Sequence, residues 1–402
     1  MATLWDMGRD RALQRILLRK NQERRIRAGH PWVFSNEIWK KPQDLMPGQV
    51  VEVADSRGHY LGSGFYNEHS LISVRLFSRR PRELDAAFIA EALARADARR
   101  QALYPGSKHY RMVYGESDNL PGLVVDRYGD QLVMEIQSLG LDLRKDLILA
   151  GLKECFRPTG IYERSDSYAR KLEGLEPALG VRHGQFQPEV EIEENGLWFR
   201  ANLEHGQKTG WFYDQRENRL AVRQFSGGAR VLDCFCHTGG FALNAARGGA
   251  RSVLGLDISE RAIELCRDNA ARNGLESVCT FERADVMQSL KQKAEAGQKY
   301  DLVILDPPAF AKNRKSVEAA LKGYKEINLR AMQVLEPGGI LISCSCSHHI
   351  EDEPFRVMLV DAARDAKRQL VLLEFRHQAK DHPVLLAMKE TQYLKCAVLS
   401  VE

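Results

Sequence analysis

The sequence predicts an α/β protein in three successive parts: a small, mostly β barrel, a central α+β domain and a C-terminal doubly wound sheet that is largely parallel. Three observations predict this organisation. The chain has 402 residues, more than one hydrophobic core usually serves. Its first fifth carries short strand-like runs separated by polar turns, and its second half repeats a rhythm of strand, turn and helix.

The first part, residues 1–84, is basic and mostly β. Strand-like runs at 49–55, 59–67 and 71–78 are separated by turn residues. Up to Arg82 the chain holds 15 Lys and Arg against 8 Asp and Glu, a net charge of +7, and the remainder has a net charge of −3. This asymmetry favours a surface that binds nucleic acid, but a solvated surface without a partner explains it as well.

Three aromatic residues extend the nucleic-acid interpretation. Trp32, Phe34 and Tyr66 lie in or beside the strand-like segments of this basic part. Aromatic rings stack on unpaired bases while Lys and Arg contact phosphates. We therefore expect these three side chains to contribute base stacking.

The central part, residues 85–195, mixes helix and strand. An alanine-rich helical period covers 84–102, and turn-forming residues at 115–123 lead toward a strand at 131–137. A second helix is predicted over 143–156.

The third part, residues 196–402, alternates strands with helices, as a doubly wound sheet does. The predicted strands of this alternation are 230–234, 252–257, 278–282, 300–305 and 340–346. No helix is predicted between the last two strand-like runs, 370–375 and 393–401. We expect them to form an antiparallel pair that completes the sheet.

The composition excludes several classes of protein. Apolar residues make up 44% of the chain, yet no run reaches the roughly 18 residues of a membrane span, and the N-terminus lacks an apolar leader. The eight cysteines form no C-x-x-C pair, so neither a zinc ribbon nor a disulfide framework is indicated. We expect a reduced, cytoplasmic protein without a metal.

A ligand loop is predicted where strand 230–234 ends. The chain turns at Gly239 and Gly240 into a helix, so the backbone can approach a ligand and present free N–H groups to it. Asp257 ends the next strand, where an acid accepts hydrogen bonds from ribose hydroxyls. Asp285 follows the third strand. A tight connection without a ligand would also explain the two glycines.

The loop departs from the dinucleotide pattern G-x-G-x-x-G. Phe235 and His237 occupy positions where that pattern has small residues. The departure disfavours a nicotinamide cofactor.

A second motif, L-D-P-P-A-F at 305–310, closes the fourth strand. It places the acid Asp306, the rigid pair Pro307 and Pro308, and the ring of Phe310 at the carboxyl edge of the sheet, where open α/β proteins bind ligands. A base can stack on the ring while the acid hydrogen-bonds one of its nitrogens. A structural turn is the alternative explanation of the prolines.

Taken in order, D-C-F-C-H-T-G-G-F at 233–241, Asp257, Asp285 and D-P-P-A-F at 306–310 resemble the class I S-adenosylmethionine methyltransferases that act on nucleic-acid bases. Further segments narrow the resemblance to the RlmI-type methyltransferases of large-subunit ribosomal RNA, over almost the whole chain. These segments are 115–122, 162–166, 205–216, 381–383 and 393–395.

The resemblance implies a PUA RNA-binding domain (1–84), a central domain (85–195) and a Rossmann-like methyltransferase domain (196–402), with S-adenosylmethionine as cofactor. The cofactor-binding residues that it implies are Lys208, Thr209, Tyr213, Asp233, Thr238, Gly239, Phe241, Asp257, Ile258, Asp285 and Asp306. The residues expected to contact the substrate base are Pro307, Pro308 and Phe310. The implied partner is 23S ribosomal RNA. The sequence does not decide between free RNA and a partly assembled subunit, or between a monomer and a homodimer.

A nucleophile is expected where the fifth strand ends in S-C-S-C-S-H-H at 343–349. Cys344 and Cys346 share one face of the strand, and a core role for both is the alternative. Cys346 lies nearer the carboxyl end, beside the expected position of Asp306. A thiolate there could add to carbon 6 of cytosine and make carbon 5 nucleophilic, with Asp306 at ring nitrogen 3. Its S-C-S context resembles that of the nucleophile of RNA cytosine-C5 methyltransferases.

Other functions stay open at this point. Many RNA cytosine methyltransferases carry a second cysteine after the Asp-x-Pro motif, where this chain has Ala309; RlmI-type sequences lack it too. An acid-Pro-Pro-aromatic motif also suits methylation of guanine nitrogen 2 or adenine nitrogen 6 without a covalent step. A noncatalytic RNA-binding assembly factor that retains the cofactor site is a third reading. The roles of Cys344, His348 and His349 are not assigned.

Overall fold

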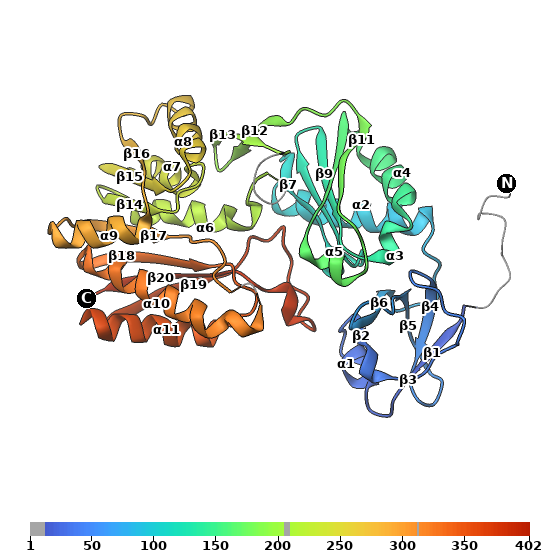
Figure 1. Ribbon diagram of the computed structural model, residues 1–402. Helices are drawn as coiled ribbons and strands as arrows, with labels where there is room; N and C mark the ends of the chain where they lie inside the picture. The colour runs from blue at the N-terminus through green and yellow to red at the C-terminus, as the bar shows by residue number, and fades with distance from the viewer. Residues whose placement is uncertain (1–12, 205–209, 312) are drawn as a thin grey trace. The chain divides into compact units, whose positions relative to one another are not determined.

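The computed structural model describes residues 13–204, 210–311 and 313–402. The chain folds into two compact units, whose elements Figure 1 labels. The first contains residues 1–187 and 383–391, and the second contains residues 188–382 and 392–402. None of the helices in the described ranges is long and apolar enough to cross a membrane.

The first unit begins with a six-stranded sheet in the order β2-β6-β5-β4-β1-β3, in which only β1 and β4 pair in parallel. The predicted runs at 49–55, 59–67 and 71–78 correspond to β4, β5 and β6. Its elements are β1 (Arg15–Leu18), α1 (Glu23–Arg27), β2 (Trp32–Phe34), η1 (Ser35–Glu37), β3 (Ile38–Lys40), β4 (Val50–Ala54), β5 (Tyr60–Tyr66) and β6 (Ile72–Ser78).

A second sheet of the first unit has the order β11-β10-β9-β8-β7, with β9 and β10 parallel. Helices α2 and α4 pack on each other and bury Phe88, Ile89, Leu93 and Leu152 in its core. Its elements are α2 (Ala86–Leu103), β7 (His109–Tyr114), η2 (Gly115–Asp118), β8 (Leu123–Tyr128), β9 (Gln131–Ile136), α3 (Leu139–Asp142), α4 (Lys145–Phe156), β10 (Gly160–Ser165), α5 (Tyr168–Leu172), β11 (Ala178–Gly184) and η6 (Lys389–Thr391).

Charge pairs join the two sheets of the first unit. Arg75 on β6 donates to Glu116 at 2.9 Å and to Glu173 at 3.0 Å. The indole N–H of Trp32 donates to the same Glu116 carboxylate at 2.7 Å, and the Arg75 guanidinium lies over the indole ring. Because all three charged side chains are largely buried, these contacts fix the first sheet to the second.

The expected role of Tyr66 in stacking on RNA is wrong. Its side chain is 2% exposed, packs in the core of the first sheet and hydrogen-bonds Lys41. A buried ring cannot stack on a base without unfolding its surroundings. Trp32 and Phe34 are half-buried and carry guanidinium groups of Arg75 and Arg25 over their rings.

The second unit is built on a seven-stranded sheet in the order β16-β15-β14-β17-β18-β20-β19. The first five strands in this order are parallel to one another, whereas β20 is antiparallel to both β18 and β19. The last two strands therefore form the antiparallel pair that was predicted. Figure 1 shows the sheet between layers of helices, and α9, α10 and α11 share one core beneath it.

The bounds of the elements in the second unit follow the predicted alternation of strands and helices. They are β12 (Glu189–Glu194), β13 (Leu197–Asn202), η3 (Tyr213–Gln215), α6 (Arg216–Ala221), η4 (Val222–Phe225), β14 (Arg230–Cys234), α7 (Gly240–Arg247), β15 (Ser252–Asp257), α8 (Glu260–Arg272), β16 (Cys279–Arg283), α9 (Val286–Glu295), β17 (Tyr300–Leu305), η5 (Arg314–Ser316), α10 (Val317–Gln333), β18 (Leu335–Ser345), α11 (Asp352–Ala366), β19 (Leu370–Arg376) and β20 (Lys395–Val401). The hairpin β12–β13 was not predicted.

A buried carboxylate, Glu194, joins that hairpin to α6. It accepts two hydrogen bonds from Arg219, at 2.6 and 2.7 Å, and one from the indole N–H of Trp211 at 2.8 Å. The Arg219 guanidinium also lies over the Trp211 ring. A Cβ at Gly240 would lie 2.7 Å from Cδ of Arg219, so any larger residue at the start of α7 would have to displace the Arg219 side chain.

Substituting Glu194 by Gln should destabilise the second unit by about 3 kcal/mol, because it leaves the buried Arg219 charge without its anion. Urea unfolding followed by tryptophan fluorescence measures this. The matched control is Glu318→Gln, which breaks the exposed pair with Lys322 and should leave the transition where it is. Equal effects of the two variants would contradict the assigned role of Glu194.

Candidate active site

The predicted ligand loop follows β14 and has an unusual backbone. Phe235, His237 and Gly239 all have positive φ, at 64°, 51° and 86°. Two non-glycine residues in the left-handed region are strained conformations, of the kind found at ligand sites. The loop is held by hydrogen bonds from the His237 N–H to Asp257 at 3.0 Å and from the Asn269 amide to the Thr238 carbonyl at 3.0 Å.

Asp233, the one acidic residue of β14, is fully buried. Its Oδ2 accepts the Ala242 N–H at 2.9 Å in the first turn of α7, and its Oδ1 has no hydrogen-bond partner among the described residues. Burial raises the pKa of Asp233 well above its usual value, and the negative charges of Asp306 and Asp257 raise it further. A cationic ligand group would satisfy the unpaired oxygen and favour the ionised acid.

Two further acids stand where the sequence predicts them, at the carboxyl ends of β15 and β16. Asp257 accepts backbone N–H groups of His237 and Ser259. Asp285 is exposed and caps α9 by accepting the Gln288 N–H at 2.9 Å. Beside Asp257, the side chain of Ile258 is 67% exposed, so it can cover an apolar ligand ring.

Asp306 follows β17, the neighbour of β14 in the sheet. Gln215 donates to its Oδ1 at 2.9 Å, and Asn218 donates to Gln215 at 2.7 Å. Arg376 in turn donates to Asn218 at 3.1 Å. This chain of buried amides orients Asp306, and the sequence reasoning missed it because three distant segments supply it.

The two cysteines at the end of β18, one in the strand and one just after it, lie in different surroundings. Cys344 is fully buried, pairs in register with Cys396, and has a pKa raised well above its usual value by the hydrogen bond with Cys396 and by burial. Cys346 comes after the last residue of β18 and is partly exposed. Because Leu305 pairs with Ser343 in parallel register, Cys346 and Asp306 emerge at the same edge of the sheet.

The expected substrate contacts stay predictions. Pro307 is buried and Pro308 is exposed. The Phe310 ring is half-buried against the core and packs on Tyr324, with ring centroids 4.5 Å apart. Only its outer side is left for a base.

The upstream motif at 205–216 is described in part. Lys208 and Thr209 lie outside the described residues. Tyr213 is buried with the Arg216 guanidinium over its ring, and Phe241 is buried at the start of α7. Asp214, which the sequence reasoning did not single out, accepts the Tyr393 hydroxyl at 2.5 Å.

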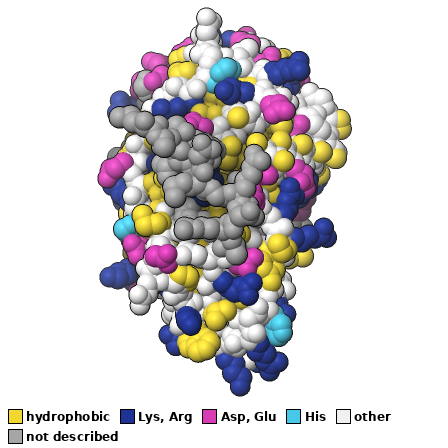
Figure 2. Space-filling view, turned by 90° about the vertical axis from the view of Figure 1, so that its right-hand side faces the viewer, with side chains coloured by type: hydrophobic (Ala, Val, Ile, Leu, Met, Phe, Trp, Pro, Cys, Tyr) yellow, Lys and Arg dark blue, Asp and Glu magenta, His cyan; other side chains and the backbone are white. Residues whose placement is uncertain are grey.

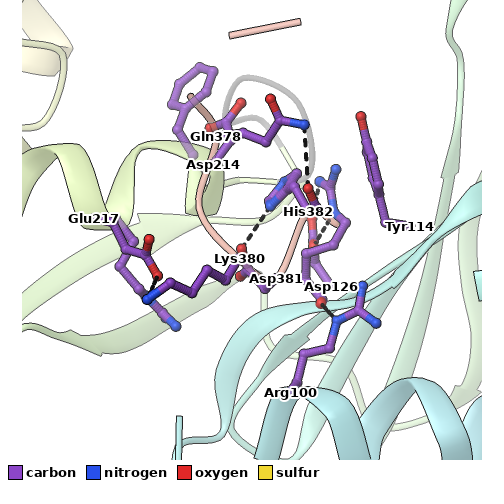
Figure 3. Close-up of polar contacts among 12 residues, drawn as sticks. Arg100, Tyr114, Asp126, Asp214, Glu217, Gln378, Lys380, Asp381 and His382 are labelled. Atoms are coloured by element: carbon purple, nitrogen blue, oxygen red, sulfur yellow. Dashed lines mark hydrogen bonds and ion pairs between the residues drawn. The ribbon is translucent and has the colours of Figure 1, made fainter. Parts of the chain in front are cut away.

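The segment 377–382 completes this region beside α6. Figure 3 shows the imidazole of His382, which contacts Asp381 at 2.8 Å, and Lys380, which pairs with Glu217 at 3.7 Å. The Gln378 amide donates to the His382 carbonyl at 3.3 Å. Asp381 and His382 are both buried in this turn.

His237 should make stability depend on pH. Burial lowers its pKa to about 4 from an ordinary value of 6.5, so the unfolded chain binds more protons between these pH values and stability falls as pH falls through them. Between pH 7 and pH 5 the loss is about 2 kcal/mol. His237→Asn, which tolerates a positive φ, should lose that much less stability over this range in urea unfolding. The same pH dependence in parent and variant would contradict this.

Comparisons with known proteins identify the family and the fold of the chain. A family profile described as S-adenosylmethionine-dependent methyltransferase matches residues 179–393, and one described as PUA-like domain matches residues 16–79. A protein described as a SAM-dependent methyltransferase from Streptococcus mutans has the same fold, with a TM-score of 0.82 at 21% identity over 96% of this chain and 99% of that one. A methyltransferase solved in complex with SAH gives 0.83 at 22% identity, with the same coverage.

Curated relatives are more similar in sequence. The ribosomal RNA large subunit methyltransferase I of Shewanella denitrificans is 42% identical over 96% of this chain and 99% of its own length. The proteins of that name from Aeromonas hydrophila and Erwinia tasmaniensis are 40% and 38% identical, over at least 95% of this chain and 98% of their own length. The chain therefore belongs to the S-adenosylmethionine-dependent methyltransferases, in the group of the ribosomal RNA large subunit methyltransferase I proteins, with a PUA-like domain at its N-terminal end.

Proposed function

We propose that this protein transfers a methyl group from S-adenosylmethionine to carbon 5 of a cytosine in large-subunit (23S) ribosomal RNA, through a covalent adduct with Cys346. The relatives' name supports ribosomal RNA of the large subunit as the substrate. The observation that carries the choice of carbon 5 is the position of Cys346, an accessible thiol at the edge where Asp306 emerges. Carbon 5 needs such a thiol because it is a poor nucleophile by itself.

The other cysteines support this choice by exclusion. All eight lie in described residues, and only Cys155 and Cys346 are not buried. Cys155 is on α4 in the first unit, which does not contain the methyltransferase sheet. Thiol reactivity requires access to the reagent, so Cys346 is the nucleophile that the methyltransferase fold offers.

The cofactor loop fits S-adenosylmethionine. The unpaired Oδ1 of Asp233 suits the ammonium group of the methionine part, and Asp257 ends the strand where ribose hydroxyls bind. Only one carboxylate oxygen of Asp285 accepts the capping hydrogen bond, so the other can accept one from the exocyclic amine of the cofactor. When bound, the cofactor would supply the methyl group, and its sulfur would keep the electron pair of the sulfur–methyl bond that breaks.

Cys346 and Asp306 take part in the other steps of the proposed reaction. The Cys346 thiolate forms a bond to carbon 6, and the electron pair of the carbon 5–carbon 6 double bond lets carbon 5 take the methyl group. Asp306, oriented by Gln215, donates a hydrogen bond to ring nitrogen 3 from its protonated carboxyl and so stabilises the adduct. A base then removes the proton from carbon 5, the double bond re-forms, and the carbon–sulfur bond breaks to release the thiolate.

Replacing Cys346 by Ala should abolish methyl transfer to ribosomal RNA and leave cofactor binding unchanged, as measured by tritium transfer and calorimetry. RNA containing 5-fluorocytosine should give a covalent adduct mapped to Cys346, since the fluorine blocks the loss that releases the enzyme. Cys155→Ala is the matched control and should transfer normally. Full transfer by Cys346→Ala would favour methylation of an exocyclic amine instead.

The PUA-like domain supplies the RNA-binding surface of this proposal. Figure 2 shows Lys and Arg side chains gathered at the lower end of the view, the level at which Figure 1 has β1, β3 and α1. Lys20 after β1, Arg24 on α1 and Lys40 on β3 are exposed, and no acidic partner is found for them among the described residues. Unpaired surface cations of this kind bind phosphates and release counterions.

Replacing Lys20, Arg24 and Lys40 together by Gln should weaken RNA binding and reduce its log–log salt dependence by about 2, because up to three phosphate contacts are lost. The binding is followed by fluorescence anisotropy at several salt concentrations. A control triple, Lys291→Gln, Lys322→Gln and Arg364→Gln, removes the same charge from the methyltransferase unit. The control should keep the salt dependence of the parent. If the control lowers the salt dependence of RNA binding more than the first triple does, the assigned surface is contradicted.

A further inference from the structure

Lys395 is a buried cation directly behind the candidate nucleophile. It begins β20, pairs in register with Ser345 and is 2% exposed. Its ammonium donates to the carbonyl of Ser347 at 2.8 Å, of Ile350 at 2.7 Å and of Tyr393 at 2.6 Å. Two of these carbonyls belong to the turn that follows Cys346, so the ammonium lies beneath that turn.

The charge of this lysine is not neutralised by a direct contact. Within the ranges that the structure describes, no carboxylate oxygen lies within 4.0 Å of its Nζ. The anionic groups that interact with it at longer range are Asp352 and the Cys346 thiolate. Asp352 is engaged by His377 at 2.9 Å and by Gln392 at 3.4 Å. A buried cation held only by neutral carbonyls stabilises an anion that forms nearby.

We propose that Lys395 is a positioning residue whose fixed positive charge stabilises the thiolate of Cys346 and so prepares it for attack. This inference rests on the proposed function for its use in catalysis, but the effect on the thiol does not require RNA or cofactor. Burial lowers the pKa of Lys395 to about 8, so the ammonium is mostly protonated at neutral pH.

The lysine acts through its field and not by proton transfer. All three N–H bonds of the ammonium are committed to carbonyl oxygens. It therefore has no hydrogen left for the sulfur and no free lone pair for the carbon 5 proton. Fixed charge is effective here because the surroundings are buried and exclude the water that would screen it.

The remaining titratable groups near the pair do not replace it. Burial raises the pKa of the Tyr324 phenol, so it is neutral over the working range, and the Tyr393 hydroxyl is held by Asp214. His348 is exposed and stacks on Tyr393. The groups that face this region are Asp306 after β17, Tyr324 on α10, Asp352 on α11, His348 and Tyr393.

The test is the pH dependence of alkylation by iodoacetamide in the full chain, with each thiol quantified by mass spectrometry. Lys395→Met should raise the pH midpoint for alkylation of Cys346 by about one unit and slow the reaction at pH 7 about tenfold. Lys395→Arg should keep the midpoint of the parent. Cys155, exposed in the other unit, is the internal standard and should not change in any variant.

Two further variants separate charge from structure. Tyr324→Phe removes the 3.0 Å hydrogen bond to Ser347 in the same turn without a change of charge, so it should leave the midpoint in place. Lys395→Gln, which keeps two donors for the carbonyls, serves if Lys395→Met does not fold. A Cys346 midpoint that is the same in the parent and the uncharged variant overturns the inference. Full methyl transfer by Cys346→Ala would instead overturn the proposed function and leave this result standing.

Discussion

The second unit depends on the buried pairing of Glu194 with Arg219. Through Trp211 the pair fixes the residues just after the segment 205–209, and through Arg219 it fixes α6 and the glycine start of α7. Because α6 directly follows Gln215, the same pair also sets the residue that orients Asp306. One buried charge thus helps to set both the start of α7 and the side chain that contacts Asp306, and a neutral substitute should loosen both.

Parallel register then decides which side chains meet. Neighbouring strands β14, β17 and β18 end at one edge, so Asp233, Asp306 and Cys346 come together although more than a hundred residues separate the first from the last. Their chemistry differs because their burial differs. Asp233 is enclosed and has an unpaired oxygen, Asp306 is held by amides, and Cys346 lies beyond the strand end where solvent reaches it.

Sequence patterns could predict the features that depend on neighbours in the chain. They include the strands β4 to β6, the alternation after residue 229 and the antiparallel finish at β19 and β20. The rest depends on contacts between distant segments. Tyr66 has the pattern of a surface strand residue, but its ring is buried in a core. Nothing in the sequence distinguishes Lys395 from an exposed strand lysine, because the three carbonyls that it contacts come from the fold. The excursion of 383–391 into the first unit has no sequence signal at all.

The contrast between Cys344 and Cys346 shows how the fold assigns chemistry to one of two similar side chains. Both follow a serine and belong to the same face by strand periodicity. Pairing with β20 encloses Cys344 against Cys396 and raises its pKa, which makes it unreactive. The pairing of β18 with β20 ends at Ser345 and Lys395, so Cys346 lies outside the sheet. The residue that pairs with its neighbour Ser345 is the buried Lys395. The end of one strand pairing therefore provides both the access and the charge that a nucleophilic thiol needs.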